Sequence, residues 1–386
     1  MHSGTLSTCN GVYYGNLMII YGRAEYYPDC SPLFIEKKVT EVSIDSIRKQ
    51  PIKVAEERIS IIKKRLEIMG YTLDYCKKEY LEAYRYGEFI DFDTFLQMIR
   101  CVNSVLNPTK NVVDGLNLIN FSYWDRMLWE YNSRKRADYK LNFDEDFFLH
   151  LDQLVKLRLF CEGHKENEVL YWDIFETIEA GYYTEDEIFH EMDPKYKITL
   201  ITEGPSDMRI IENAFSHYCP EYYHFFEFVD YEKISVFGGA DKSKVLFKAF
   251  VKLQIINRIL FIFDNDAAGV SNYESIRALE HQDNLMMMLL PDLDCLKNVM
   301  VIGPEGDVEH DVNGYASSIE CFLDFSLMGK EVLFRWSSYN SEIDRYQGEI
   351  VEKRFLQNTI DKIGSKDYNH EKLDILINAI IAQVCR

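Results

Sequence analysis

The spacing of apolar residues changes near residue 194. Upstream, consecutive prolines at 51, 108 and 194 leave two long stretches that are free to be helical. Apolar residues recur there at helical spacing: Val54, Ile61, Ile62, Leu66 and Met69, then Phe147, Leu151, Leu154 and Leu157, then Leu170, Ile174 and Ile178. This pattern predicts a mainly helical region behind a short entry segment of strands and turns.

From residue 195 onward, short apolar runs alternate with helical patterns. Four runs read as strands: Ile198–Thr202, Ile234–Phe237, Ile259–Phe263 and Leu285–Leu290. Helices are expected after the first two, one with Met208, Ile211 and Phe215 on one face and one from Lys242 to about Asn257. Apolar strands that alternate with helices predict a parallel sheet covered on both faces.

These patterns predict an α/β protein with three parts. Residues 1–193 form a mainly helical domain, 195–330 a parallel sheet flanked by helices, and 331–386 a short helical extension. The last helix of the extension is predicted from Leu373, Ile375, Leu376 and Ile380.

Charge and cysteine usage narrow the function classes. The formal net charge is -20, so a protein that holds nucleic acid through its own basic surface is disfavoured. The nine cysteines are scattered and form no CxxC pair, which favours reduced thiols and a cytoplasmic location over a zinc site. The longest strongly apolar run, Leu285–Leu290, is too short to span a membrane, and no secretory signal is apparent.

Acidic residues follow two of the predicted strands. Glu203 comes directly after the first, and Asp264 and Asp266 come after the third. The carboxyl ends of parallel strands meet at one edge of a sheet, so these carboxylates are expected to converge. Converging carboxylates repel one another unless protons or a divalent cation compensate them, and Mg²⁺ or Mn²⁺ suits such oxygen ligands. The alternative is that the acids only cap the following helices.

The two motifs together resemble the Toprim domain of primases, topoisomerases and overcoming-lysogenization-defect (OLD) nucleases. The matching residues are strand–Glu203-Gly204, followed by strand–Asp264-Asn265-Asp266-x-x-Gly269. The resemblance implies that Glu203 acts as general acid or base and that Asp264 and Asp266 bind Mg²⁺. Two further acids are similar to positions of the OLD branch and imply a second metal: Asp207, four residues after Glu203, and Glu320 in Ser318-Ile319-Glu320, which opens a predicted helix.

Three N-terminal segments in order resemble the HEPN/Toprim-associated N-terminal domain of bacterial phage-defence proteins: residues 15–22, 32–34 and 65–72. HEPN ribonucleases use an arginine and a histidine separated by four to six residues, and Arg158 and His164 fit that spacing. Such a pair also arises by chance, and residues 151–194 carry 3 basic against 12 acidic residues, which disfavours RNA. A scaffold or a dimerisation surface is the preferred reading of this half.

The helix predicted from Lys242 to about Asn257 carries several lysines near its start. Candidates for nucleic-acid contact are Lys242, Lys244 and Lys248; the alternative is that they form a solvated helix face. The preceding Gly238-Gly239 does not belong to a Walker loop, because Asp241 stands where that motif has glycine before lysine. OLD nucleases normally carry an ATPase, so a separate ATPase or sensor subunit is expected as a partner.

The leading hypothesis is a Mg²⁺-dependent DNA endonuclease or nickase that acts with a partner in antiphage defence, in the cytoplasm, with a homo-oligomer as one expected assembly. Two alternatives remain open: an RNA-cleaving toxin that uses Arg158 and His164, and a catalytically inactive sensor or assembly subunit.

Overall fold

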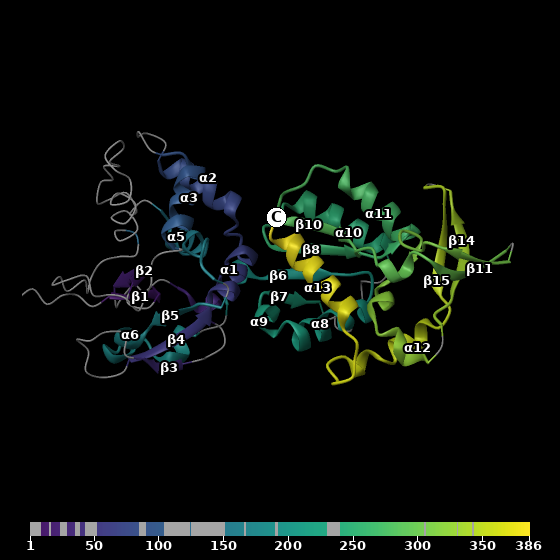
Figure 1. The fold of residues 1–386 in the computed structure, drawn as a ribbon. Helices are drawn as coiled ribbons and strands as arrows, with labels where there is room; N and C mark the ends of the chain where they lie inside the picture. Colours follow the sequence, from purple (N-terminus) through teal and green to yellow (C-terminus); the bar gives the residue numbers. More distant parts are fainter. Residues whose placement is uncertain are drawn as a thin grey trace, which may run out of the picture. The chain divides into compact units, whose positions relative to one another are not determined.

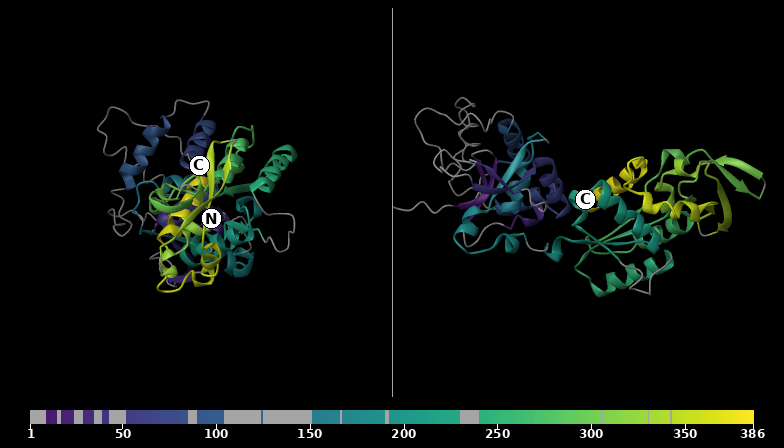
Figure 2. Two further views of the ribbon diagram at one scale, coloured as in Figure 1. Left: turned by 90° about the vertical axis from the view of Figure 1, so that its right-hand side faces the viewer. Right: turned by 90° about the horizontal axis from the view of Figure 1, so that it is seen from below.

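The computed structural model describes residues 9–14, 17–23, 29–34, 39–42, 52–84, 90–103, 124, 151–165, 167–189, 192–229, 240–304, 306–329, 331–341 and 343–386. The chain divides into two compact units, Met1–Met192 and Asp193–Arg386 (Figures 1 and 2). Each unit has its own sheet and its own buried core.

The first unit contains an antiparallel sheet of five strands in the order β2-β1-β5-β4-β3. Its strands are β1 (Cys9–Tyr14), β2 (Leu17–Arg23), β3 (Val39–Val42), β4 (Ile52–Arg58) and β5 (Val169–Asp173). Its described helices are η1 (Ser31–Leu33), α1 (Ile59–Ile68), α2 (Leu73–Ala83), α3 (Phe92–Asn103), α5 (Gln153–Phe160), α6 (Phe175–Glu179) and α7 (Glu185–Ile188).

The prediction of helix was wrong at two places in this unit. Val54 lies in β4, and Leu170 lies in β5, where it pairs with Glu57. Both side chains are fully buried. Runs of five to seven residues are too short to separate strand from helix by spacing, and here pairing between distant strands decided the outcome. Phe147 lies outside the described residues.

The second unit contains a parallel sheet in the order β10-β8-β6-β7. Its strands are β6 (Ile198–Ile201), β7 (Phe226–Phe228), β8 (Arg258–Phe263) and β10 (Leu285–Leu289). Three of the four predicted strands are confirmed; Ile234–Phe237 lies outside the described residues, and β7 was not anticipated. The chain runs outward from β6 to β7 on one side and to β8 and β10 on the other, so the order reverses between β6 and β8. In open parallel sheets, ligands bind at such a reversal.

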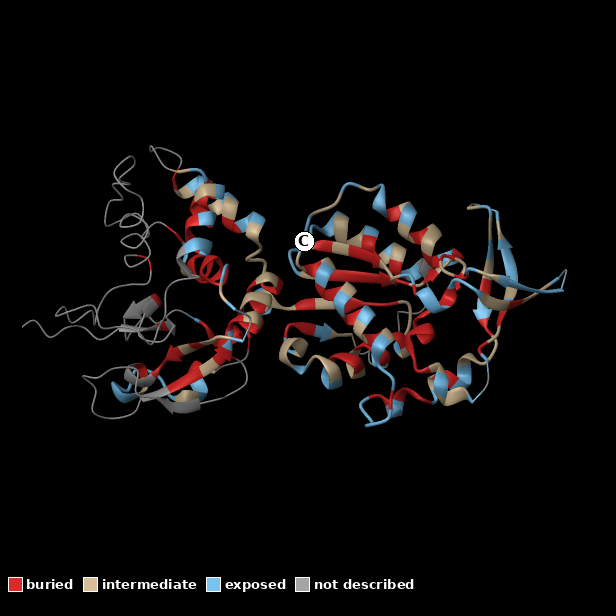
Figure 3. Cartoon of the chain, viewed as in Figure 1, coloured by how far each residue is buried: buried red, intermediate tan, exposed pale blue. Residues whose placement is uncertain are grey.

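Helices cover both faces of the parallel sheet (Figure 3). Phe261 and Phe263 of β8 pack with Phe247 of α10 (Ala240–Leu253) and Ile276 of α11 (Ala267–Arg277). The alternate residues of β8 point to the opposite face and are equally buried. That face is covered by α13 (Glu371–Val384), which contacts β10 and α8 (Pro205–Tyr218).

The predicted helical extension is only partly helical. Helix α13 is confirmed, but residues 334–350 form a hairpin of β14 (Phe334–Asn340) and β15 (Arg345–Ile350). The hairpin joins β11 (Val299–Gly303) and β12 (Gly306–His310) in a second sheet of order β12-β11-β14-β15. Phe334 is buried beside exposed Arg335, an alternation typical of a strand. This unit also contains β9 (Asn265–Asp266), β13 (Ala316–Ser317), α9 (Pro220–Tyr223), α12 (Lys353–Gln357), η3 (Pro194–Tyr196), η4 (Asp294–Leu296), η5 (Ile319–Phe322), η6 (Phe325–Met328) and η7 (Ile360–Lys362).

Candidate functional site

Glu203 and Asp264 lie at the carboxyl ends of two neighbouring parallel strands. Glu203 follows β6 and Asp264 follows β8, which pair from Ile198 to Ile201. The backbone amide of Asp264 donates a hydrogen bond of 3.2 Å to Oε1 of Glu203. The structure therefore brings together two acids that are 61 residues apart in sequence.

Asp264 and Asp266 are held by donors from the later part of the unit. The amide of Ile319 donates to Oδ1 of Asp264 at 3.2 Å. Asp266 is the N-cap of α11, because its Oδ1 accepts from the amide of Gly269 at 2.8 Å, and its Oδ2 accepts from Nε2 of Gln347 at 2.7 Å. Helix capping thus accounts for one oxygen of Asp266 and leaves the other directed toward β15.

Asp207 and Glu320 are both buried. Oδ2 of Asp207 accepts from the amide of Gly204 at 2.9 Å, which closes the first turn of α8. Glu320 opens η5, a short 3₁₀ helix, and its side chain is fully inaccessible to solvent. It accepts hydrogen bonds from Ser318 at 2.7 Å and from Gln357 at 2.8 Å.

The electrostatics show that these acids are close neighbours. Burial raises the pKa of Glu203 to about 8, and the negative charges of Asp266 and Asp207 add to the rise. Burial and the charge of Glu320 raise the pKa of Asp207 to about 6. The pKa of Asp264 is raised by burial and by the charges of the four carboxyl groups of Asp207, Glu203, Asp266 and Glu320, and that of Asp266 is raised mainly by burial. We call Glu203, Asp207, Asp264, Asp266 and Glu320 the acidic cluster.

Lys353 supplies a positive charge to the acidic cluster. Its Nζ lies 3.1 Å from Oε2 of Glu320. Burial alone would lower the pKa of Lys353, but attraction by Glu320, Asp264 and Asp207 outweighs burial and raises it. The sequence reading missed Lys353, Gln347 and Gln357, since no motif or spacing marks them. The available signal was the general requirement that buried carboxylates find cationic or donor partners.

The donor chemistry of the acidic cluster suits a hard divalent cation, because all five side chains offer carboxylate oxygens. The raised pKa values of Glu203, Asp207, Asp264 and Asp266 also indicate a shortage of positive charge at the site. Within the described part of the chain, however, no three His, Cys, Asp or Glu side chains are arranged to hold a metal ion as they stand. Each of the five acidic side chains instead accepts at least one hydrogen bond from a surrounding donor.

Replacing Gly269 by alanine should disrupt this site from the backbone. A Cβ at Gly269 would overlap the carbonyl oxygen of Asp264 and lie 2.9 Å from its carbonyl carbon. Because the obstacle is backbone, we expect a loss of about 3 kcal/mol in unfolding free energy, at the upper end of overpacking costs. Gly204→Ala is the matched control, since its Cβ would lie 3.8 Å from Asp207. Equal unfolding midpoints in urea for the two variants would contradict the prediction.

Without divalent cations, stability should fall as the pH rises from about 4 to about 8. Glu203 and Asp207 have raised pKa values in the folded state, so over this range the native chain retains protons that the unfolded chain has released. The contribution is fully present below pH 4 and lost above pH 8. Thermal unfolding in EDTA measures the slope, which Glu203→Gln should flatten. A Glu203→Gln slope as steep as that of wild type would refute the assignment.

The lysine-bearing helix α10 begins beside the acidic cluster. Ser243 Oγ contacts the carbonyl oxygen of Thr202, the residue before Glu203, at 3.5 Å. Lys242 and Lys248 are exposed and Lys244 is half-buried. The structure thus places the start of this helix near the site, while Gly238-Gly239 lies outside the described residues.

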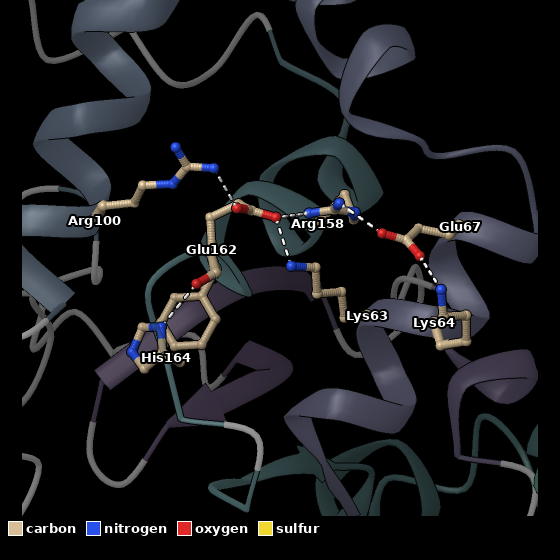
Figure 4. Close-up of polar contacts among 8 residues, drawn as sticks. Lys63, Lys64, Glu67, Arg100, Arg158, Glu162 and His164 are labelled. Atoms are coloured by element: carbon tan, nitrogen blue, oxygen red, sulfur yellow. Dashed lines mark hydrogen bonds and ion pairs between the residues drawn. The ribbon is translucent and has the colours of Figure 1, made fainter. Parts of the chain in front are cut away.

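Arg158 and His164 lie in the first unit, within a network of ion pairs (Figure 4). Arg158 is buried and donates to Glu162 at 2.7 Å and to Glu67 at 2.8 Å. Nδ1 of His164 lies 2.8 Å from the carbonyl oxygen of Phe160, and its ring stacks on the Phe160 ring. Burial lowers the pKa of His164, which favours the neutral form. These contacts give Arg158 a structural role as the partner of two carboxylates.

A family model described as HEPN/Toprim N-terminal domain 1 matches residues 12–197. This match supports the resemblance of the N-terminal half and a nuclease-related role. It ends one residue before β6, so the acidic cluster lies outside it. No curated protein and no solved structure matches the chain. None of the helices in the described residues combines the length and apolar character needed to cross a membrane.

Proposed function

We propose that the unit Asp193–Arg386 is a nuclease of the Toprim class that uses Mg²⁺ or Mn²⁺ to cleave DNA. The observation that carries the proposal is the meeting of Glu203 and Asp264 where the strand order reverses, with Asp207, Asp266 and Glu320 close by. Asp264 and Asp266 would hold a first cation, and Asp207 and Glu320 would contribute to a second. A bound cation supplies the positive charge that phosphodiester cleavage requires.

Glu203 is suited to proton transfer. Burial and the neighbouring carboxylates raise the pKa of Glu203 to about 8 when no cation is present, and a bound cation would lower this pKa toward the range in which a group both holds and releases a proton near neutral pH. In hydrolysis, water adds to phosphorus and releases a proton, the bond from phosphorus to the leaving oxygen breaks, and that oxygen takes up a proton; the proton released by the water restores the group that donated. We assign donation of this proton to Glu203. The exposed Lys242, which precedes Ser243 at the Thr202 contact, and Lys248, further along α10, would contact backbone phosphates.

The proposal includes a partner. The net charge of -20 gives the chain little long-range attraction for DNA, so delivery by a second subunit, an ATPase or a sensor, complements the few lysines at the site. The resemblance of the N-terminal half to phage-defence proteins supports a role in antiphage defence, and that half would act as a scaffold or dimerisation surface.

Cleavage of supercoiled plasmid with Mg²⁺ or Mn²⁺ tests the proposal. Glu203→Gln and Asp264→Asn should each lower the rate by at least about 100-fold, whereas Glu280→Gln, at an exposed position in the same unit, should keep it. Variants at Glu203 and Asp264 that cut as well as the wild type would rule out this site. RNA cleavage that survives Asp264→Asn but not Arg158→Ala and His164→Ala would favour the RNA-cleaving alternative.

A further inference from the structure

Five ring side chains gather on the second sheet of the unit Asp193–Arg386. Trp336 is stacked with Tyr346, with ring centroids 5.6 Å apart and planes 30° apart, and Tyr339 meets Tyr346 edge-on at 5.3 Å. His310 and Tyr315 contact the other side of Trp336, at 5.3 and 6.0 Å. We call these five residues the aromatic face.

Strand pairing explains why the rings share one face. Tyr339 of β14 is the register partner of Tyr346 of β15, and Trp336 is the partner of Gly348, two residues further along β15. Side chains two apart in a strand point the same way. Trp336 and Tyr339 are three apart in β14, and the register shift between Trp336 and Ser338 lets their rings share one face. Gly348 matters here, because a Cβ at this position would lie 2.9 Å from the Trp336 ring. Glycine therefore lets the indole lie flat across β15.

The outer rings of the aromatic face are exposed. Tyr339 and Tyr346 have 53% and 44% of their surface accessible, while Trp336 is half-buried beneath them. Figure 3 shows β14 coloured mostly as exposed, unlike the buried strands of the parallel sheet. Clustered exposed rings on a sheet, braced by a tryptophan, are typical of a binding surface rather than of a core.

The aromatic face is anchored to the acidic cluster. Gln347, next to Tyr346, donates to Asp266 at 2.7 Å and accepts from the amide of Ala268 at 2.8 Å. Arg345, on its other side, lies over the Tyr315 ring at 5.2 Å. Because Gln347 and Tyr346 are adjacent in β15, their side chains point to opposite faces of the strand. The aromatic face itself reaches the acidic cluster through Tyr315, whose backbone forms a bridge with Asp266.

We propose that the aromatic face binds the unpaired bases of single-stranded DNA and presents the strand to the acidic cluster. Every base has a π-face, and stacking on protein rings contributes affinity that does not depend on the sequence of the strand. The nearby strand β12 carries exposed Asp307 and Glu309, which repel the phosphates of a duplex and of a single strand alike, but only a single strand offers unpaired bases to the rings. Base stacking, rather than phosphate neutralisation, therefore supplies the affinity. This assignment rests on the proposed function for one point, the choice of DNA as the nucleic acid.

Binding in EDTA tests the assignment without any cleavage. Fluorescence anisotropy of the full chain should show tighter binding of a labelled oligothymidylate of about 20 nucleotides than of a duplex of equal length. Tyr346→Ala and Tyr339→Ala should each weaken binding about tenfold, as expected for one lost stack. Tyr346→Phe should keep it, because the ring and not the hydroxyl makes the contact. Tyr182→Ala is the control, since this tyrosine of the other unit is 48% exposed.

Three results would overturn the assignment. Equal binding by wild type, Tyr346→Ala and Tyr339→Ala would exclude the aromatic face. Tighter binding of an oligouridylate would reassign it to RNA. A wild-type dimer in sedimentation that Tyr346→Ala dissociates, without binding of single strands, would make the face a self-association surface. Plasmid cleavage distinguishes a failure of this assignment from a failure of the proposed function. Asp264→Asn should lose plasmid cleavage but still bind the labelled single strand in the anisotropy measurement.

Discussion

Replacing Lys353 by methionine is expected to raise the affinity of the acidic cluster for Mg²⁺ or Mn²⁺ roughly 100-fold. Two unit charges about 4 Å apart interact by about 4 kcal/mol at an effective dielectric constant of about 20. The Lys353 side chain is 42% exposed, and solvent screening reduces this repulsion toward a bound cation. A residual of about 2.7 kcal/mol corresponds to a factor of about 100. Isothermal titration calorimetry measures the affinity directly.

The same substitution should destabilise the protein in EDTA. Lys353 is the cationic partner of Glu320, whose side chain is fully buried, and removing one member of such a pair typically costs about 3 kcal/mol or more. Adding the divalent cation should restore the loss, because it replaces the missing charge. Lys362→Met, at an exposed lysine of the same unit, should change neither property. Unchanged cation affinity in Lys353→Met would show that this lysine does not compete with a bound cation.

In the second unit, the sequence predicts correctly those strands whose apolar pattern matches the way they are packed. Apart from Thr199 and the first residue of β8, Arg258, the residues of β6, β8 and β10 are apolar because helices cover both faces, and this pattern can be recognised in the sequence. Once those strands were placed, a general property of parallel sheets put Glu203 and Asp264 at one edge. The hydrogen bond from the backbone amide of Asp264 to the Glu203 carboxylate confirms that the two residues lie together.

The unpredicted part depends on contacts between distant segments. Gln347 reaches Asp266 from 81 residues away, and Gln357 reaches Glu320 from 37 residues away. Neither glutamine lies in a motif. Gln347 is positioned by the β14–β15 hairpin, which the prediction of a helical extension over residues 331–386 did not include, and Gln357 is positioned by α12. Lys353 belongs to the same segment. Local sequence patterns therefore could not predict which cation balances the charge of the acidic cluster.

The first unit shows a similar division. Helix α5 begins where its N-cap Asp152 accepts from the amides of Leu154 and Val155, a local signal that the sequence contains. The sheet, in contrast, pairs β1 and β4 with β5, across more than a hundred residues of chain. Val54 and Leu170 therefore took strand geometry from their partners rather than from their neighbours.

Replacing Arg158 by methionine is expected to lower the unfolding free energy by about 3–5 kcal/mol, the range found when one member of a buried ion pair is removed. Arg158 is 3% exposed and is shared by Glu162 and Glu67. Burial acts to raise the pKa of Glu162, but hydrogen bonds from Arg100, Lys63 and Arg158 outweigh it and lower that pKa to about 2. Urea unfolding at neutral pH measures the loss.

Two comparisons separate this structural role from an RNA-cleaving one. Arg100→Met removes an ion pair to the same Glu162 from a side chain that is 46% exposed, so it should cost only about 1 kcal/mol. Because the folded-state pKa of Glu162 is depressed, its stabilising contribution is present above about pH 4.5 and lost as the pH falls toward 2, and Glu162→Gln should weaken that acid sensitivity. Arg158→Met with wild-type stability and abolished RNA cleavage would instead assign the arginine to catalysis. If Arg158→Met loses several kcal/mol of stability while His164→Ala remains as stable as the wild type, Arg158 has a structural role in the first unit.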